Sequence, residues 1–63
     1  MEFKDKVKFA REKLHLSQMD FAKACGVAFN TLNRWENGIR KPTYVALRKF
    51  YAFCESKGII FED

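Results

Sequence analysis

The chain has 63 residues and a mass of 7.4 kDa, which is the size of one small domain and excludes a two-domain protein. Hydrophobic residues make up 48% and aromatic residues 16%, with only three Gly and one Pro, so the composition excludes a disordered or linker sequence. The net charge is +4, and residues 30–49 carry five basic side chains and one acidic side chain. This excess indicates a polyanionic partner, although proteins that bind none often carry a similar charge.

No apolar run approaches the length of a membrane helix, and the N-terminal segment is charged throughout, unlike a signal peptide. We therefore expect a cytoplasmic protein with no membrane partner. The two cysteines, Cys25 and Cys54, each fall within a hydrophobic pattern. This placement favours reduced thiols in the core, with a disulfide or redox switch as the minor alternative.

The N-terminal half contains two predicted helices. The first is amphipathic, because four apolar residues recur at helical spacing: Phe3, Val7, Ala10 and Leu14. The second begins at about Gln18, after Ser17 as its N-cap, and ends at Gly26, which adopts the left-handed conformation without steric cost. This second helix is therefore short.

The C-terminal half contains two more predicted helices. One spans roughly residues 28–36 and stops at Gly38, and its pattern places three apolar residues in the core: Leu32, Trp35 and Ile39. The other is capped by Thr43 and ends at Gly58. Residues 59–63 suit a short strand or an extended segment. The sequence thus predicts a single all-α domain over residues 1–63, a compact bundle of four to five helices with a short extended C-terminal segment.

The second and third predicted helices are joined by a three-residue turn that contains Gly26, which is the arrangement of a helix-turn-helix unit, here at about residues 17–36. The third helix then directs a polar face outward, formed by Phe29, Asn30, Asn33, Arg34 and Asn37. A helix has the width to enter the DNA major groove, where Asn and Arg side chains pair with the edges of adenine and guanine. The pattern therefore indicates binding to double-stranded DNA.

The sequence resembles the Cro/C1-type (XRE-type) helix-turn-helix domain of phage repressors and bacterial regulators, a lambda repressor-like fold. The resemblance covers about residues 7–54 and rests on four motifs: Ser17-Gln18-x-Asp20-Phe21-Ala22, Gly26-Val27, Leu32-x-x-Trp35-Glu36-Asn37-Gly38 and Arg40-x-Pro42-Thr43. It implies a repressor-like transcriptional regulator that binds specific DNA sequences as a homodimer at the nucleoid. The residues themselves offer no pair of nucleophile and base, no phosphate-binding Gly loop and no metal set, so we expect no enzymatic activity, no cofactor and no small-molecule substrate.

The resemblance assigns roles to individual residues. Base reading falls to Phe29, Asn30, Asn33 and Arg34, and phosphate binding to Gln18, Asn37, Arg40 and Lys41. Gln18 is also expected to brace the start of the third helix. Arg11 and Glu36 are expected to form an internal ion pair. This chain departs from the family pattern at three positions. His15 replaces the usual Gly, so a left-handed His or a longer turn is needed; Ala28 replaces a capping Ser or Thr; and Phe29 replaces Gln, which suits a thymine methyl group.

Alternatives remain for the tail and for the function. Ile59, Ile60 and Phe61 are candidate dimer contacts, or they pack back across the first helix. The same fold also serves protein-interaction modules of antitoxin-like or coactivator-like type, which an exposed Phe29 and an apolar tail would favour. Catalysis or metal binding has little support, because the lone His15 has no partner at ligand spacing.

Overall fold

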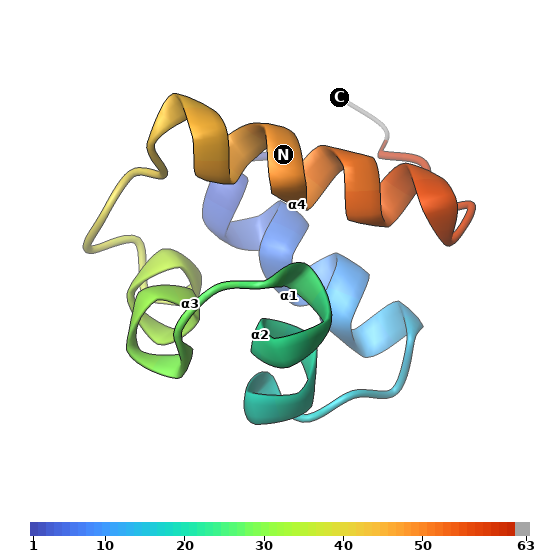
Figure 1. Cartoon of the computed structure of the whole chain (residues 1–63), viewed down its shortest axis with the longest axis horizontal. Helices are drawn as coiled ribbons and strands as arrows, with labels where there is room; N and C mark the ends of the chain where they lie inside the picture. The colour runs from blue at the N-terminus through green and yellow to red at the C-terminus, as the bar shows by residue number, and fades with distance from the viewer. Residues whose placement is uncertain (62–63) are drawn as a thin grey trace.

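The computed structural model describes residues 1–61, which form four helices and no strand: α1 (Phe3–Lys13), α2 (Gln18–Cys25), α3 (Phe29–Glu36) and α4 (Tyr44–Ser56). Figure 1 shows α4 running across the top of the molecule, with α2 and α3 below it. α3 packs against α1 and α2, and α2 also packs against α4. The predicted all-α fold is confirmed. None of these four helices is long and apolar enough to cross a membrane.

The core is centred on Phe50 of α4, a fully buried side chain that contacts the other three helices. Its ring centroid lies 5.2 Å from that of Phe3 in α1, 6.3 Å from that of Phe21 in α2 and 6.5 Å from that of Trp35 in α3, each pair in edge-to-face geometry. Aromatic pairs favour this geometry at such separations. One residue therefore connects all four helices through the apolar faces that the sequence predicts.

Two of the four helices begin at a capping side chain. The hydroxyl of Ser17 accepts a hydrogen bond from the backbone N–H of Asp20 at 3.1 Å, and the hydroxyl of Thr43 accepts one from Ala46 at 3.2 Å. Both predicted caps are confirmed. α3 begins at Phe29, one residue later than predicted, and its N-cap, Ala28, has no side-chain group to offer.

All four helices end in the same hydrogen-bonding pattern, in which an N–H group bonds to the carbonyl five residues earlier. The four pairs are Leu16 to Arg11, Val27 to Ala22, Ile39 to Arg34 and Ile59 to Cys54, at 2.9 to 3.2 Å. This Schellman motif requires a left-handed residue just before the donor. Glycine fills that position at three ends, and His15 fills it after α1 with φ 56°. The left-handed His is one of the two outcomes expected at this position.

The core prediction for Ile39 is wrong. Its side chain is 74% exposed, whereas Trp35, one helical turn earlier, is buried. The chain leaves the helical path at Gly38, which has φ 71°, so the apolar spacing no longer corresponds to one face of a helix. A periodic pattern that continues past a left-handed glycine therefore does not predict burial.

The C-terminal segment packs largely against its own chain. Ile59 is buried, and the ring of Phe61 lies 5.9 Å from that of Phe9 in α1 and 6.0 Å from that of Phe50. Ile60 is 79% exposed. Residues 59–61 are non-helical and form no strand, and the rest of the predicted extended segment, residues 62–63, lies outside the described residues. Of the three candidate dimer contacts, only Ile60 is open to a partner.

Cys25 and Cys54 are free and buried, as predicted for core thiols. Burial, and to a lesser extent the charge that Cys54 would carry, raise the pKa of Cys25 to about 12. Burial likewise raises the pKa of Cys54 to about 11. Because the thiolate is the reactive form, both side chains are protonated and unreactive at neutral pH.

Candidate nucleic-acid interface

The turn between α2 and α3 sets the direction of α3. Gly26 has φ 76°, and no heavy atom lies within 4 Å of the position that a Cβ would occupy there. The requirement for glycine is therefore conformational rather than steric. Ala22, buried in α2, is small enough to let the two helices approach closely. This turn places α3 beside α2 (Figure 1), and Asn30 and Arg34 of α3 are exposed.

The predicted base-reading residues differ in exposure. Asn30 and Arg34 are exposed, and Phe29 is 42% exposed despite its apolar ring. Asn33 is only partly exposed, since it lies nearer to α2. Asn30 and Arg34 therefore satisfy the condition on which DNA reading depends, which is that the protein's own atoms do not cover them.

Behind α3 lies a buried carboxylate. Glu36 is 2% exposed and is the one charged side chain buried among the described residues. The guanidinium of Arg11 in α1 donates to both carboxylate oxygens, from Nε to Oε2 at 2.8 Å and from Nη2 to Oε1 at 3.2 Å. Arg11 Nη1 also donates to the carbonyl of Leu16 at 3.2 Å. The expected ion pair is thus present, and it joins α3 to α1 and to the loop before α2.

A chain of side-chain amides extends from this carboxylate toward the surface. Gln18 Nε2 donates to Glu36 Oε1 at 3.2 Å, and Gln18 Oε1 accepts from Asn33 Nδ2 at 3.2 Å. Asn33 Oδ1 then accepts from Asn37 Nδ2 at 3.1 Å. Three of the predicted DNA-contacting residues therefore form one hydrogen-bonded network in the protein itself.

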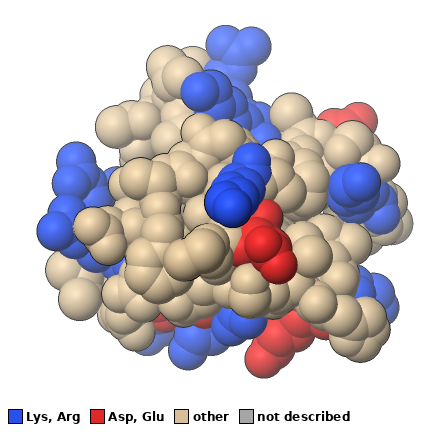
Figure 2. Space-filling model, turned by 60° about the horizontal axis from the view of Figure 1, so that its bottom comes forward, with Lys and Arg blue, Asp and Glu red and all other residues tan. Residues whose placement is uncertain are grey.

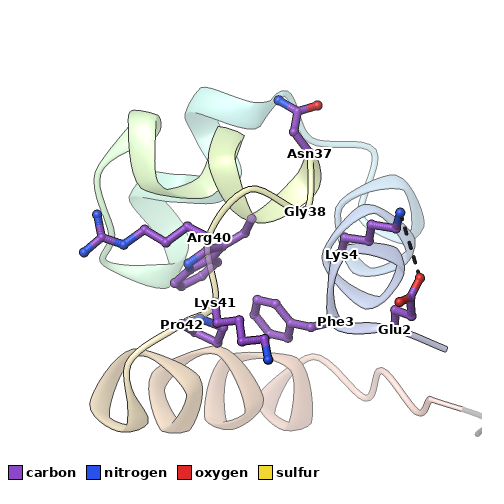
Figure 3. Close-up of a pocket in the computed structure, with 9 residues that line it drawn as sticks. Glu2, Phe3, Lys4, Asn37, Gly38, Arg40, Lys41 and Pro42 are labelled. Atoms are coloured by element: carbon purple, nitrogen blue, oxygen red, sulfur yellow. Dashed lines mark ion pairs between the residues drawn. The ribbon is translucent and has the colours of Figure 1, made fainter.

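The loop after α3 carries the basic residues predicted to bind phosphates. Arg40 and Lys41 are both exposed and line a pocket of about 240 Å³ between this loop and the start of α1. Figure 3 shows Arg40 pointing away from the pocket and Lys41 extending toward Phe3. Lys4 lies across the pocket, where its side chain carries an exposed ion pair to Glu2 at 3.9 Å. Exposed pairs of this length contribute little to stability. Glu2 also lines the pocket, so its carboxylate offsets the charge of Lys4 there.

The charge on this side of the molecule is distributed around its edge. Figure 2 views the molecule from the side on which α2 and α3 lie in Figure 1, and Lys and Arg side chains gather mainly at the margins of a largely uncharged surface. One basic and one acidic side chain lie nearer its centre. Acidic side chains also lie at its margin, so the cations there are interspersed with carboxylates.

Sequence reasoning did not predict the network of amides. It assigned Gln18 both to a phosphate and to bracing the start of the third helix, and Asn33 to bases, and it named neither the contact of Gln18 with Asn33 nor that with Glu36. One local signal was present, because Asn33 and Asn37 are four positions apart on a helix and so lie on the same face. The contact between Gln18 and Glu36 joins residues 18 positions apart, and it depends on how α2 crosses α3.

Two helices joined by a glycine turn, with a polar second helix open to solvent, define a DNA-binding domain of the helix-turn-helix class. A family model described as helix-turn-helix matches residues 7–50, and the chain belongs to this family, in its Cro/C1 (XRE) type. The family comprises DNA-binding domains and not enzymes. The type II methyltransferase M.SsoII of Shigella sonnei is 40% identical over 53 residues, which cover 79% of this chain and 14% of that protein. No solved structure is significantly similar.

Proposed function

We propose that the chain is a sequence-specific, repressor-like transcriptional regulator that inserts α3 into the DNA major groove. The supporting observation is the exposure of Asn30 and Arg34 on one face of α3, beside a loop that carries Arg40 and Lys41. The proposal does not extend to methyltransferase activity, because the similar region is 14% of the methyltransferase. A regulator of this kind acts in the cytoplasm, bound to the nucleoid.

Base discrimination comes from three exposed side chains of α3. Arg34 offers paired donors that suit the O6 and N7 acceptors of guanine, and the amide of Asn30 suits the N6 and N7 edge of adenine. Phe29 has no hydrogen-bonding group, and its exposed ring suits the methyl group of thymine. The preferred site is therefore expected to contain these bases within a few pairs of one another.

Phosphate contacts come from the start of α2 and from the loop after α3. Gln18 and Asn37 offer amide donors, and Arg40 and Lys41 offer positive charge. Each neutralised phosphate releases counterions, so the affinity should fall as the salt concentration rises. These contacts set the register of α3 on the duplex without discriminating between bases.

Tight binding is expected from a homodimer on DNA. One small module buries little surface, and two-fold dimers place half-sites about 34 Å apart. Ile60, 79% exposed beside the buried Ile59, is the tail residue available for such a contact. Sedimentation of the chain alone and with a duplex carrying two half-sites would test this part of the proposal. A 1:1 complex on that duplex, with one half-site empty, would contradict it.

Selection of bound duplexes from a random pool, at two salt concentrations, tests the proposal as a whole. We expect a defined motif at both concentrations and a lower total affinity at the higher one. Retained affinity without any enriched motif would reject sequence-specific binding. No retained duplex at low salt would reject DNA binding altogether.

A second candidate is a protein-interaction module built on the same fold. It is favoured by one observation, which is that large apolar side chains are exposed at the start of α3 and α4: Phe29, Tyr44 and Val45. Phe29→Ala separates the two functions, because a DNA reader should lose preference at one base position and keep its salt dependence. Unchanged DNA binding by this variant would leave the exposed apolar groups to a protein partner.

A further inference from the structure

The geometry points to a positioning role for Asn33: its amide holds Gln18 and Asn37 in the orientation that presents N–H donors to DNA phosphates, and it does not read bases. This inference rests on the proposed DNA binding. It differs from the family-based expectation, which assigns Asn33 to base reading. It concerns three amides that lie on α2, on α3 and at the end of α3.

The direction of each hydrogen bond follows from the buried carboxylate. An ionised carboxylate only accepts, so Gln18 must turn its NH2 group toward Glu36, 3.2 Å away. This orientation turns Gln18 Oε1 toward Asn33, which must then donate through Nδ2. Asn33 Oδ1 is left to accept from Asn37 Nδ2. One carboxylate thereby sets the orientation of three amides in succession.

The first member of this chain is held firmly. Glu36 is buried, and Arg11 donates to each of its oxygens, at 2.8 and 3.2 Å. Bidentate guanidinium–carboxylate pairs have a strong geometric preference. Gln18 therefore donates to a carboxylate oxygen whose position is fixed by Arg11 of α1. The orientation of Gln18 then fixes that of Asn33, and the orientation of Asn33 fixes that of Asn37.

Asn30 and Asn33 occupy different situations on the same helix. To pair with adenine, an asparagine must offer both its oxygen and its NH2 group to the base edge. Both groups of Asn33 already bond to protein atoms, and the side chain is partly covered. Within residues 1–61, no hydrogen bond engages the side chain of Asn30, which is exposed. The amide of Asn30 is thus available to pair with a base, whereas the amide of Asn33 is occupied by Gln18 and Asn37.

The orientation imposed on Gln18 and Asn37 suits phosphate. Each amide nitrogen carries two hydrogens, and the network uses one from each of these residues. Phosphate oxygens accept hydrogen bonds and donate none, so the second N–H is the group that DNA requires. Loss of Asn33 would free the amide of Asn37 to rotate and would leave the amide of Gln18 held by Glu36 alone. Binding to DNA would then have to order the released groups.

The test compares Asn33→Ala with Asn30→Ala, the same substitution on the same helix at the exposed position. Affinities of the whole chain are measured for the selected duplex, for single-base variants of it and for random duplex. We expect Asn33→Ala to weaken all duplexes alike, by about three- to tenfold, because binding must then order the released side chain, without changing the order of preference. Asn30→Ala should instead flatten the preference at one position. A changed preference at one base for Asn33→Ala would overturn the inference, as would unchanged affinity.

A second measurement does not depend on DNA. In the free protein, the side-chain NH2 resonances of Gln18 and Asn37 in ¹H–¹⁵N NMR spectra should be distinct from those of mobile amides. Asn33→Ala should move the Asn37 set to the shifts of mobile amides and should shift the Gln18 set by a smaller amount, because Glu36 still accepts from Gln18. Asn30→Ala should leave both sets in place. Unmoved resonances in Asn33→Ala would overturn the inference even if DNA binding is confirmed, and the expected shifts would support the network even if the chain bound no DNA.

Discussion

Arg11 and Glu36 form a bidentate ion pair, although they lie 25 positions apart in the sequence. The shorter contact, from Nε to Oε2, is 2.8 Å. The carboxylate is 2% exposed, so this partner replaces the contacts with water that burial removes. We expect Arg11→Ala to lower the free energy of unfolding by about 3–5 kcal/mol, because it leaves a buried charge unpaired. Urea denaturation at neutral pH would measure the change.

The matched control for this pair is the double variant Arg11→Met, Glu36→Leu, which removes both charges and keeps much of the side-chain volume. Apolar replacements of buried ion pairs are often neutral or stabilising. It should therefore be more stable than Arg11→Ala. Equal destabilisation by the two would mean that the lost packing, and not the unpaired charge, causes the effect.

The uncapped start of α3 offers a stabilising substitution. Ala28 has φ −70° and ψ 148°, close to the −71° and 164° of Ser17 and to the −69° and 163° of Thr43, both of which cap their helices. Ala28→Ser should raise the free energy of unfolding by about 1 kcal/mol, because its hydroxyl can accept an orphan N–H of the first turn. Thermal melting would measure it, with Ala24→Ser, an exposed change inside α2, as the control. No gain at position 28 would contradict the prediction.

The left-handed conformation of His15 is a source of strain that glycine removes. Residues with a Cβ adopt this conformation at a cost of about 1–2 kcal/mol, part of which His15→Gly loses again to the entropy of the unfolded chain. We expect His15→Gly to stabilise the protein by about 0.5 kcal/mol. Gly26→Ala, at φ 76° with open space around it, should destabilise by about 1–2 kcal/mol. Chemical denaturation of both variants provides the measurement, and shifts of the same sign would refute this account.

The two buried thiols predict a loss of stability in alkali. Their pKa values are raised from 9.0 to about 12 for Cys25 and to about 11 for Cys54. The unfolded chain therefore releases these protons above pH 9 while the folded chain retains them, and the free energy of unfolding falls as the pH rises from 9 toward 11. The double variant Cys25→Ala, Cys54→Ala should be less stable at pH 7 but should lose less between pH 9 and 11. Parallel pH profiles would show that other groups cause the loss.

Base and phosphate contacts should respond differently to substitution. Arg34→Ala should cost about 1–3 kcal/mol of binding free energy on the preferred duplex and relax its preference at one position. Lys41→Ala should weaken all duplexes alike and reduce the slope of affinity against salt concentration by about one contact. Fluorescence titrations with specific and random duplexes at several salt concentrations would separate the two. Equal losses on both duplexes for both variants would count against Arg34 as a reader.

Much of the fold could be predicted because its signals are local. Ser17, Thr43 and Gly26 each act within one turn of their own position, so sequence alone locates the helix boundaries to within a residue or so. Ile39 shows where this fails: its spacing from Trp35 is helical, but the chain reverses between them. The role of a periodic residue depends on the path of the backbone, which a single left-handed residue changes.

The sequence predicts which residues lie at the candidate site better than it predicts the hydrogen bonds between them. Exposure of Asn30 and Arg34 follows from the helical face that they share. The hydrogen bond from Asn33 to Gln18 does not follow from that face. It depends on the orientation of Gln18, which depends in turn on the position of Glu36 against α1. These contacts join three helices, and their relative placement is a property of the packed core rather than of any short stretch of sequence.

The central place of Phe50 bears on how long such a small protein survives in a cell. The ring of Phe50 packs against aromatic rings of α1, α2 and α3. Separation of any one of these helices would therefore expose the core to water. We therefore expect cooperative unfolding, in which a protease meets either an intact substrate or a fully open one. The lifetime of the molecule is then expected to depend on how firmly this central ring is packed.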